Sequence, residues 1–308
     1  MSIETITTDV ATAPASEPVE VSGTRKLGPL GWVCISWLVA IVGAAVLAPI
    51  LPLDDPSESF GEIARQGPGA SGHILGGDSI GRDMLSRVIF GARTSLLIAV
   101  GAVLLGLLVG GFLGLLAGYV RGRVDTVLTT LFNVFLSIPA LVLALSLVAV
   151  LASPDPAGQD SISHTRRVVV LILALGIVTV PILGRITRAS TLSWAEREFV
   201  KAAEVSGARP SRIIFREVLP NVLPAMMSIA LLGIAVAIVA EGSLALLGVG
   251  VQEEPTWGNI IAGGRRELSN DAPHIVFVPS AAIFFTVLSL NYLGDVIRAR
   301  FDVREAVL

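Results

Sequence analysis

The sequence predicts an all-α protein that crosses a membrane six times. Of the 308 residues, 53% are hydrophobic and 15% are charged, and the mean hydropathy is +0.78. This composition is typical of membrane proteins and not of soluble domains. Because lipid offers the backbone no hydrogen-bond partners, each apolar stretch of roughly 20 residues is expected to be a helix. The six stretches lie near 30–51, 95–119, 128–152, 167–187, 221–247 and 276–297.

The N-terminal part of the chain divides into a tail and a first membrane unit. Residues 1–25 are expected to be a disordered cytoplasmic tail, because they are rich in Thr, Ala and Pro and carry four acids but no base before Arg25. The unit 26–94 joins the first span to an extracytoplasmic loop. In its last stretch, 81–93, apolar residues recur at helical spacing between arginines. This pattern predicts an amphipathic helix lying on the outer surface.

The core unit, 95–300, holds the remaining five spans and a cytoplasmic loop. The stretch 167–187 is the weakest of these spans, because Pro181 and Arg185 interrupt it. Residues 301–308 are predicted to be a cytoplasmic C-terminal tail. With both termini inside, 14 of the 22 Lys and Arg residues fall on the inner side, which is the arrangement that the positive-inside rule favours.

The second span carries a glycine at every fourth position. A helix face without side chains lets another helix approach closely, as in the small-residue interfaces of membrane proteins. We therefore predict a helix-packing role for this stripe. Its members are Gly106, Gly110, Gly114 and Gly118.

A charged segment, 198–220, separates the fourth and fifth spans on the predicted cytoplasmic side. Its first residues, from Glu198 to Glu204, are expected to form a short helix. Gly207 can turn the chain because glycine tolerates a positive φ. Pro210 suits the first turn of a second helix, where its missing N–H would be unpaired anyway. The sequence thus predicts a helix–turn–helix at the inner surface, either a plain interfacial hairpin or a docking element for another subunit.

The segment 198–220 resembles the EAA loop of ABC importer permeases, which docks into the ATPase subunit. That pattern is Glu-Ala-Ala, three residues, Gly, nine residues, Ile, one residue and Leu-Pro. The chain departs from it at Lys201 and Glu217, which stand at the glutamate and isoleucine positions, and keeps Ala202, Ala203, Gly207, Leu219 and Pro220. The resemblance assigns ATPase coupling to Glu198, Lys201, Ala202, Ala203, Gly207, Arg209, Leu219 and Pro220.

Two further segments, 73–96 and 241–261, resemble signatures of the C-type subunit of dipeptide/oligopeptide importers. The resemblance implies the type I ABC importer permease fold and a place in the bacterial cytoplasmic (inner) membrane. The implied partners are a homologous B-type permease, two ATP-binding subunits or one fused subunit, an extracytoplasmic substrate-binding protein and membrane lipid. Mg-ATP would belong to the ATP-binding subunits. The expected cargo is short peptides, or alternatively nickel, glutathione, haem or another small solute.

No catalytic residue, cofactor or metal is expected in this chain. A P-loop is missing, because neither Lys26 nor Lys201 follows a glycine, so the chain should not hydrolyse ATP itself. The net charge of −3 gives no basic attraction for nucleic acid. The three histidines are too scattered for metal-ligand spacing and are expected to be solvated in outer loops. They are His73, His164 and His274.

Three polar residues within or near the spans are candidates for the pathway or a gate: Glu241, Asn133 and Asn291. Because an ionisable group in lipid is costly, Glu241 is expected either to line the pathway or to hydrogen-bond between helices. The asparagines are expected to bridge helices or to touch cargo. A different function, secondary transport driven by an ion gradient, would require charged residues near mid-membrane in two matching halves, and only Glu241 fits that description.

Overall fold

The structure is a computed structural model, and within the residues that it describes every regular element is helical. The described residues are 28–152, 163–251, 254–269 and 272–305. The predicted N-terminal tail, 1–25, lies outside them. One isolated bridge between Gly77 and Asp83 is the β-type contact of the described part. The all-α fold class is therefore confirmed there.

The elements follow one another with short connections. The α-helices are α1 (Pro29–Leu47), α2 (Met84–Leu105), α3 (Gly111–Val120), α4 (Gly122–Ser137), α5 (Ala140–Leu151), α6 (His164–Ala195), α7 (Glu198–Val205), α8 (Pro210–Ile213), α9 (Leu219–Leu246), α10 (Trp257–Gly264) and α11 (His274–Glu305). Two segments are π-helical, η4 (Gly106–Gly110) and η5 (Ile214–Val218). Four are 3₁₀ turns, η1 (Ala48–Ile50), η2 (Gly61–Ile63), η3 (Ala70–Gly72) and η6 (Glu267–Ser269).

Five continuous helical segments are long and apolar enough to span a membrane, and a bent helix pair, which is either a broken span or a re-entrant loop, gives a sixth if it is counted as one span. That pair replaces the predicted third span, 128–152, since α4 and α5 meet at 90°. The prediction of one straight helix there was wrong because Pro139 has no amide N–H and disfavours helical backbone in Ile138. The continuous segments are Pro29–Ile50, Met84–Val120, His164–Ala195, Pro210–Leu246 and His274–Ala299.

In the stretch 81–93, predicted to lie on the outer surface, residues 84–93 are instead the first part of the continuous helical segment Met84–Val120. Asp83 caps this helix, and Arg87 is buried. The Arg87 guanidinium donates to the carbonyl of Pro56 at 3.1 Å. The prediction was wrong because the preceding loop folds over the polar face of the helix and satisfies it, so that this face does not need the water surface.

Two helices are longer than the sequence indicated. α6 continues through Pro181 and Arg185 without a break, and Pro181 is buried. A proline is tolerated inside a membrane helix when neighbouring helices pack around it. α11 extends to Glu305, so the segment predicted as a tail, 301–308, begins as helix.

The glycine stripe lies against α6. A Cβ added to Gly110 would come within 2.3 Å of the Val180 carbonyl oxygen, and one added to Gly114 within 2.4 Å of the Gly184 oxygen. Added side chains at the other two positions would meet α6 as well, at 2.2 Å for Gly106 and 2.7 Å for Gly118. The two helix backbones therefore approach so closely that only glycine fits along this line.

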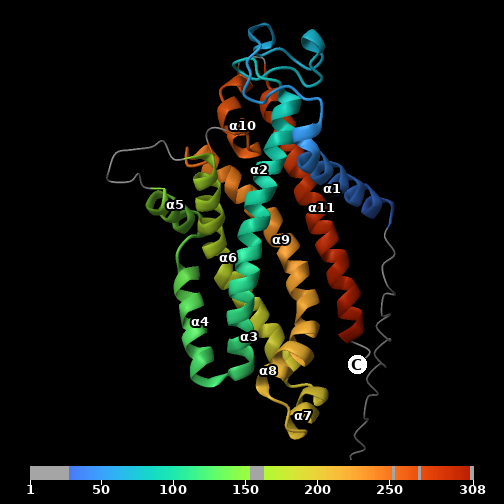
Figure 1. Cartoon of the computed structure of the whole chain (residues 1–308), viewed down its shortest axis with the longest axis vertical. Coiled ribbons are helices and arrows are strands. Elements are labelled where there is room, and N and C mark those ends of the chain that lie inside the picture. The colour runs from blue at the N-terminus through green and yellow to red at the C-terminus, as the bar shows by residue number, and fades with distance from the viewer. Residues whose placement is uncertain (1–27, 153–162, 252–253, 270–271, 306–308) are drawn as a thin grey trace, which may run out of the picture.

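Figure 1 shows the long helices running roughly along the long axis of the molecule, with α1 slanting across one side. α7 and α8 lie at one end of the bundle, and α10 lies at the opposite end with the loop 51–83. α4 follows α3, and α5 turns away near mid-height. One end therefore consists of two short helices, whereas the other combines one short helix with a long loop.

Candidate functional site at the α7–α8 end

A helix–turn–helix closes the α7–α8 end, as the sequence predicted. Gly207 has φ +78°, and its N–H donates to the Glu204 carbonyl at 2.9 Å. The N–H of Ala208 donates to the carbonyl of Ala203 at 3.1 Å, which completes the C-terminal cap of α7. Pro210 is the first residue of α8.

This helix–turn–helix is anchored firmly to the bundle. Val200 of α7 is fully buried, and so is Val218 of η5; both pack with Trp194 of α6. The hydroxyl of Tyr119 in α3 donates to Glu204 at 3.3 Å. Such contacts fix the orientation of α7 relative to the spans on both sides of it.

One feature of the site differs from the expectation. The fifth span was expected to begin after Pro220, near residue 221, but α8, η5 and α9 form one continuous segment, Pro210–Leu246. The second helix of the helix–turn–helix is therefore the end of the span itself. The predicted split was wrong because the residues after Pro210 keep an apolar side: Ile213 and Ile214 are buried in the bundle.

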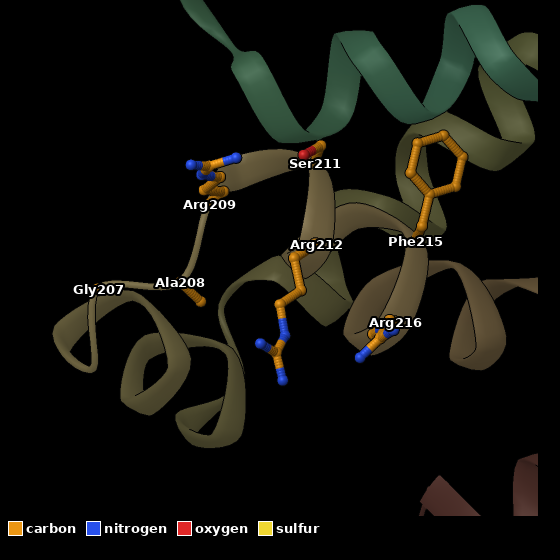
Figure 2. A pocket seen from close by; sticks show the side chains of 7 residues that line it. All are labelled: Gly207, Ala208, Arg209, Ser211, Arg212, Phe215 and Arg216. Carbon is orange, nitrogen blue, oxygen red and sulfur yellow. The ribbon is translucent and has the colours of Figure 1, made fainter.

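A pocket of about 580 Å³ opens on the outside of this turn. Three arginines and no acid stand among its lining residues, which are Gly207, Ala208, Arg209, Ser211, Arg212, Phe215 and Arg216. Figure 2 shows Arg212 and Arg216 extending in the same direction, on the other side of the helix from Phe215. The pocket is thus cationic with one aromatic wall.

The surface around the pocket has no partner within the described chain. Lys201 and the three pocket arginines form no ion pair with any described residue. The side chains of Val205 and Phe215 are 90% and 55% exposed. Unpaired cations beside exposed apolar side chains are typical of a surface that another polypeptide covers.

The remaining predicted coupling residues lie on the same end of the chain. Glu198, Ala202 and Pro220 are exposed, whereas Ala203 and Leu219 are partly buried. Sequence reasoning included Gly207 and Arg209 but left Phe215 out of the site. No sequence pattern singled it out, because Phe215 is one of many exposed apolar side chains along the spans and lies in the segment Pro210–Leu246.

The sequence and this fold together define a transport permease. The chain belongs to the family of binding-protein-dependent transport system inner membrane components, whose model matches residues 110–306. The matched region includes α7, α8 and the pocket.

Three similar proteins are permeases of peptide or glutathione transport systems. The dipeptide transport system permease protein of Alkalihalophilus pseudofirmus is 34% identical, over 95% of this chain and 90% of its own. The di/tripeptide transport system permease protein of Pseudomonas aeruginosa is 34% identical, over 94% and 96%. The glutathione transport system permease protein of Pectobacterium atrosepticum is 33% identical, over 82% and 79%.

The fold has a solved counterpart. An inward-facing structure of the MetNI methionine ABC transporter matches with a TM-score of 0.56 over 70% of this chain and 97% of that chain. The sequence identity is 19%, so this likeness shows the fold alone.

Glu241 lies far from the pocket, at the α10 end. It is 1% exposed, and its Oε2 accepts a hydrogen bond from the Ser95 hydroxyl at 3.3 Å. The Ser95 oxygen in turn accepts from the N–H of Trp257 at 3.1 Å. This chain of bonds joins α2, α9 and α10, which matches the interhelical role that the sequence allowed for Glu241. No motif indicated Ser95 as its partner.

The two candidate asparagines are not brought together. Asn133 is exposed on α4. Asn291 is partly buried on α11, and its Oδ1 is buried without a hydrogen-bond partner in the described chain. Figure 1 shows α4 and α11 on opposite sides of the bundle.

The expectation that the histidines are solvated was wrong. The His73 side chain is 15% exposed, and its Nδ1 lies 2.9 Å from Asp83 Oδ1 and 3.6 Å from Asp54 Oδ2. His164 Nε2 lies 3.0 Å from Glu254 Oε2. His274 Nε2 lies 3.0 Å from the carbonyl oxygen of Gly77. For His73 and His274 the error arose because the loop before α2 folds back on itself and on the start of α11, whereas His164 at the start of α6 meets Glu254 in the segment before α10.

Proposed function

We propose that this chain is the C-type permease subunit of an ATP-driven importer of short peptides, and that its α7–α8 end docks into the ATPase. The observation that carries the proposal is the continuity of α8 with the span Pro210–Leu246. A partner that moves α8 moves one continuous helical segment, because only the π-helical residues of η5 stand between the docking element and α9.

In this proposal α7 and α8 face the cytoplasm, and so do both termini. The partners are a homologous B-type permease, two ATP-binding subunits or one fused subunit, and an extracytoplasmic substrate-binding protein. Mg-ATP belongs to the ATP-binding subunits, and this chain performs no covalent chemistry. The exposed cations and apolar side chains around the pocket support a protein partner at this end.

ATP binding by the ATPases is coupled to movement of the spans through the α7–α8 end. Closure of the ATPases on ATP displaces the α7–α8 end, and the buried side chains of Val200 and Val218 pass that displacement to α6 and α9. Two spans tilt together, and the cavity between the two permeases opens outward. Hydrolysis releases the ATPases and returns the spans to the inward-open arrangement.

The similarity to a dipeptide permease and a di/tripeptide permease supports short peptides as the cargo of this chain. Glutathione is the second candidate, because a glutathione permease is nearly as similar. Both are small solutes with peptide bonds and free carboxylates, so one pathway chemistry suits both.

The test is co-purification of this chain with the proteins encoded beside it, followed by an ATPase assay of the wild type and of Gly207→Trp. Gly207 has φ +78° and open space around it, so a bulky residue strains the turn and obstructs docking. We expect an ATPase and a second permease to co-purify with the wild type, and the mutant to lose assembly or coupled turnover.

Gly69→Trp is the matched control, because Gly69 also has a positive φ and open space but lies in the loop at the opposite end. It should leave assembly with the ATPase unchanged. A chain that purifies alone and transports in ATP-free proteoliposomes would overturn the proposal in favour of a secondary transporter.

A further inference from the structure

The bend between α4 and α5 leaves backbone groups open. Ile138 is extended, and Pro139 caps α5 without a side-chain hydrogen bond. The N–H groups of Ala140, Leu141 and Val142 find no acceptor among the described residues. All three residues are exposed.

This bend lies at membrane depth. α4 has 16 residues, which rise about 24 Å at the usual 1.5 Å per residue. It begins at the end of the bundle near α7, and Figure 1 shows its far end near mid-height. The pair α4–α5 is long and apolar enough to be a broken span or a re-entrant loop. In either arrangement the bend, with its open backbone groups, lies within the hydrocarbon core, which is about 30 Å thick. Irregular backbone is tolerated there only where protein buries it or where it lines a water-filled cavity.

A stripe of polar side chains leads up α4 to the bend, and we call it the polar stripe. It consists of Thr126, Thr130, Asn133 and Ser137, all exposed. The spacing of four, three and four residues puts them on one helix face. The three hydroxyls donate to carbonyls of α4 itself, at 2.7–3.1 Å. The amide of Asn133 has no hydrogen-bond partner in the described chain, so it requires water or a ligand.

A neighbouring face of α4 is exposed as well, but it is apolar. Val127, Leu131 and Val134 form it, each one position away from a member of the polar stripe. Phe132 is the buried residue of α4. The helix therefore presents two chemically different exposed faces, and lipid suits only the apolar one.

We infer that the polar stripe and the α4–α5 bend line the aqueous route by which the hydrated peptide crosses the membrane. This inference rests on the proposed function and names the part of the chain that the cargo meets. Water hydrates the open amides when the route is empty. The Asn133 side-chain amide and the backbone N–H groups at the bend can donate hydrogen bonds to the carbonyl and carboxylate oxygens of a peptide.

Cysteine accessibility in the assembled complex tests the inference. The chain has a single cysteine, Cys34, which is buried, so a Cys34→Ser background leaves no other thiol in this subunit; native thiols of the partner subunits are blocked or replaced. Into it we would place Asn133→Cys or Ser137→Cys on the polar stripe, and Val127→Cys or Val134→Cys on the apolar face at similar depth. The probe is a charged, membrane-impermeant methanethiosulfonate, applied to proteoliposomes with and without saturating dipeptide.

We expect the polar-stripe cysteines to react at least about tenfold faster than the apolar-face cysteines, because a charged probe avoids lipid. Dipeptide should slow their reaction. Equal rates on both faces, or no reaction at the polar stripe in any nucleotide state, would overturn the inference. Reaction that occurs only when the homologous permease is left out would also overturn it, because that permease would then cover the polar stripe.

Failure of this inference is distinguishable from failure of the proposed function. If dipeptide transport depends on ATP but the polar stripe is unreactive, only the pathway assignment fails. As a second measurement, Asn133→Leu should raise the KM for dipeptide about three- to tenfold, the usual worth of one hydrogen bond. Asn133→Gln should restore it partly, whereas Val134→Leu should leave the KM unchanged.

Discussion

The two ends of the molecule differ in whether their polar side chains are buried and hydrogen-bonded or exposed and unpaired. At the α10 end, Glu241, Ser95 and Trp257 are buried and bonded to one another. At the α7–α8 end, Arg212 and Arg216 are exposed and unpaired within the described chain. The α10 end bonds most of these groups within this chain, although Glu241 Oε1 is buried without a hydrogen-bond partner among the described residues, whereas the arginines of the α7–α8 end pair with none of the described residues. Mutations at the α10 end should therefore reduce stability, and mutations at the α7–α8 end should reduce assembly.

The largest effect is expected from Trp257→Ala. This side chain is fully buried, and its indole N–H donates to the Val88 carbonyl at 3.0 Å. Truncating it leaves a cavity and an unpaired carbonyl, which should lower the free energy of unfolding by about 3–5 kcal/mol. Thermal melting in detergent measures the loss. Trp32→Ala is the control, because Trp32 is 62% exposed on α1. A melting temperature that both variants lower equally would contradict the comparison.

A smaller loss is expected from Ser95→Ala. Its hydroxyl joins Glu241 to the N–H of Trp257, so its removal leaves buried polar groups without partners, at a cost of about 1–3 kcal/mol. The same melting assay applies. Ser243→Ala should change stability by less than about 0.5 kcal/mol, since the exposed Ser243 hydroxyl donates only to Val239 of its own helix. An unchanged melting temperature for Ser95→Ala would contradict the prediction and would mean that water takes the place of the hydroxyl.

The smallest effect on stability is expected from the double variant Arg212→Ala/Arg216→Ala, at less than about 0.5 kcal/mol. Neither arginine has a partner to lose in the described chain. The variant should nevertheless reduce recovery of the ATPase on co-purification. Arg123→Ala, an exposed arginine at the start of α4, should not. If the double variant has a lowered melting temperature but still binds the ATPase, the two arginines stabilise the fold and do not dock the ATPase.

Local patterns predicted much of the fold and part of the site. Apolar length located the spans, and the fourfold glycine repeat marked the face that packs on α6. Gly207 and Pro210 marked the turn, because each allows or requires a particular backbone angle. These features depend on residues close together in the chain, so periodicity and turn chemistry are sufficient to find them.

Two of the errors came from contacts between distant residues, and a third came from a local break. The loop before α2 covers Arg87, so the helix at 81–93 does not lie on a surface. Pro139 was not recognised as a break, because the apolar run continues on both sides of it. His73 meets Asp54 and Asp83 only after the loop folds back. The polar groups of Arg87 and His73 find partners that no local pattern names.

The sequence by itself determined that the chain is helical, that it crosses a membrane, and that it carries a helix–turn–helix between two spans. Only the tertiary structure decided that α8 is continuous with α9, that Glu241 pairs with Ser95, and that the polar stripe of α4 is exposed. The physical reason is that burial of a polar group is settled by its partner, and Ser95 and Glu241 are 146 residues apart.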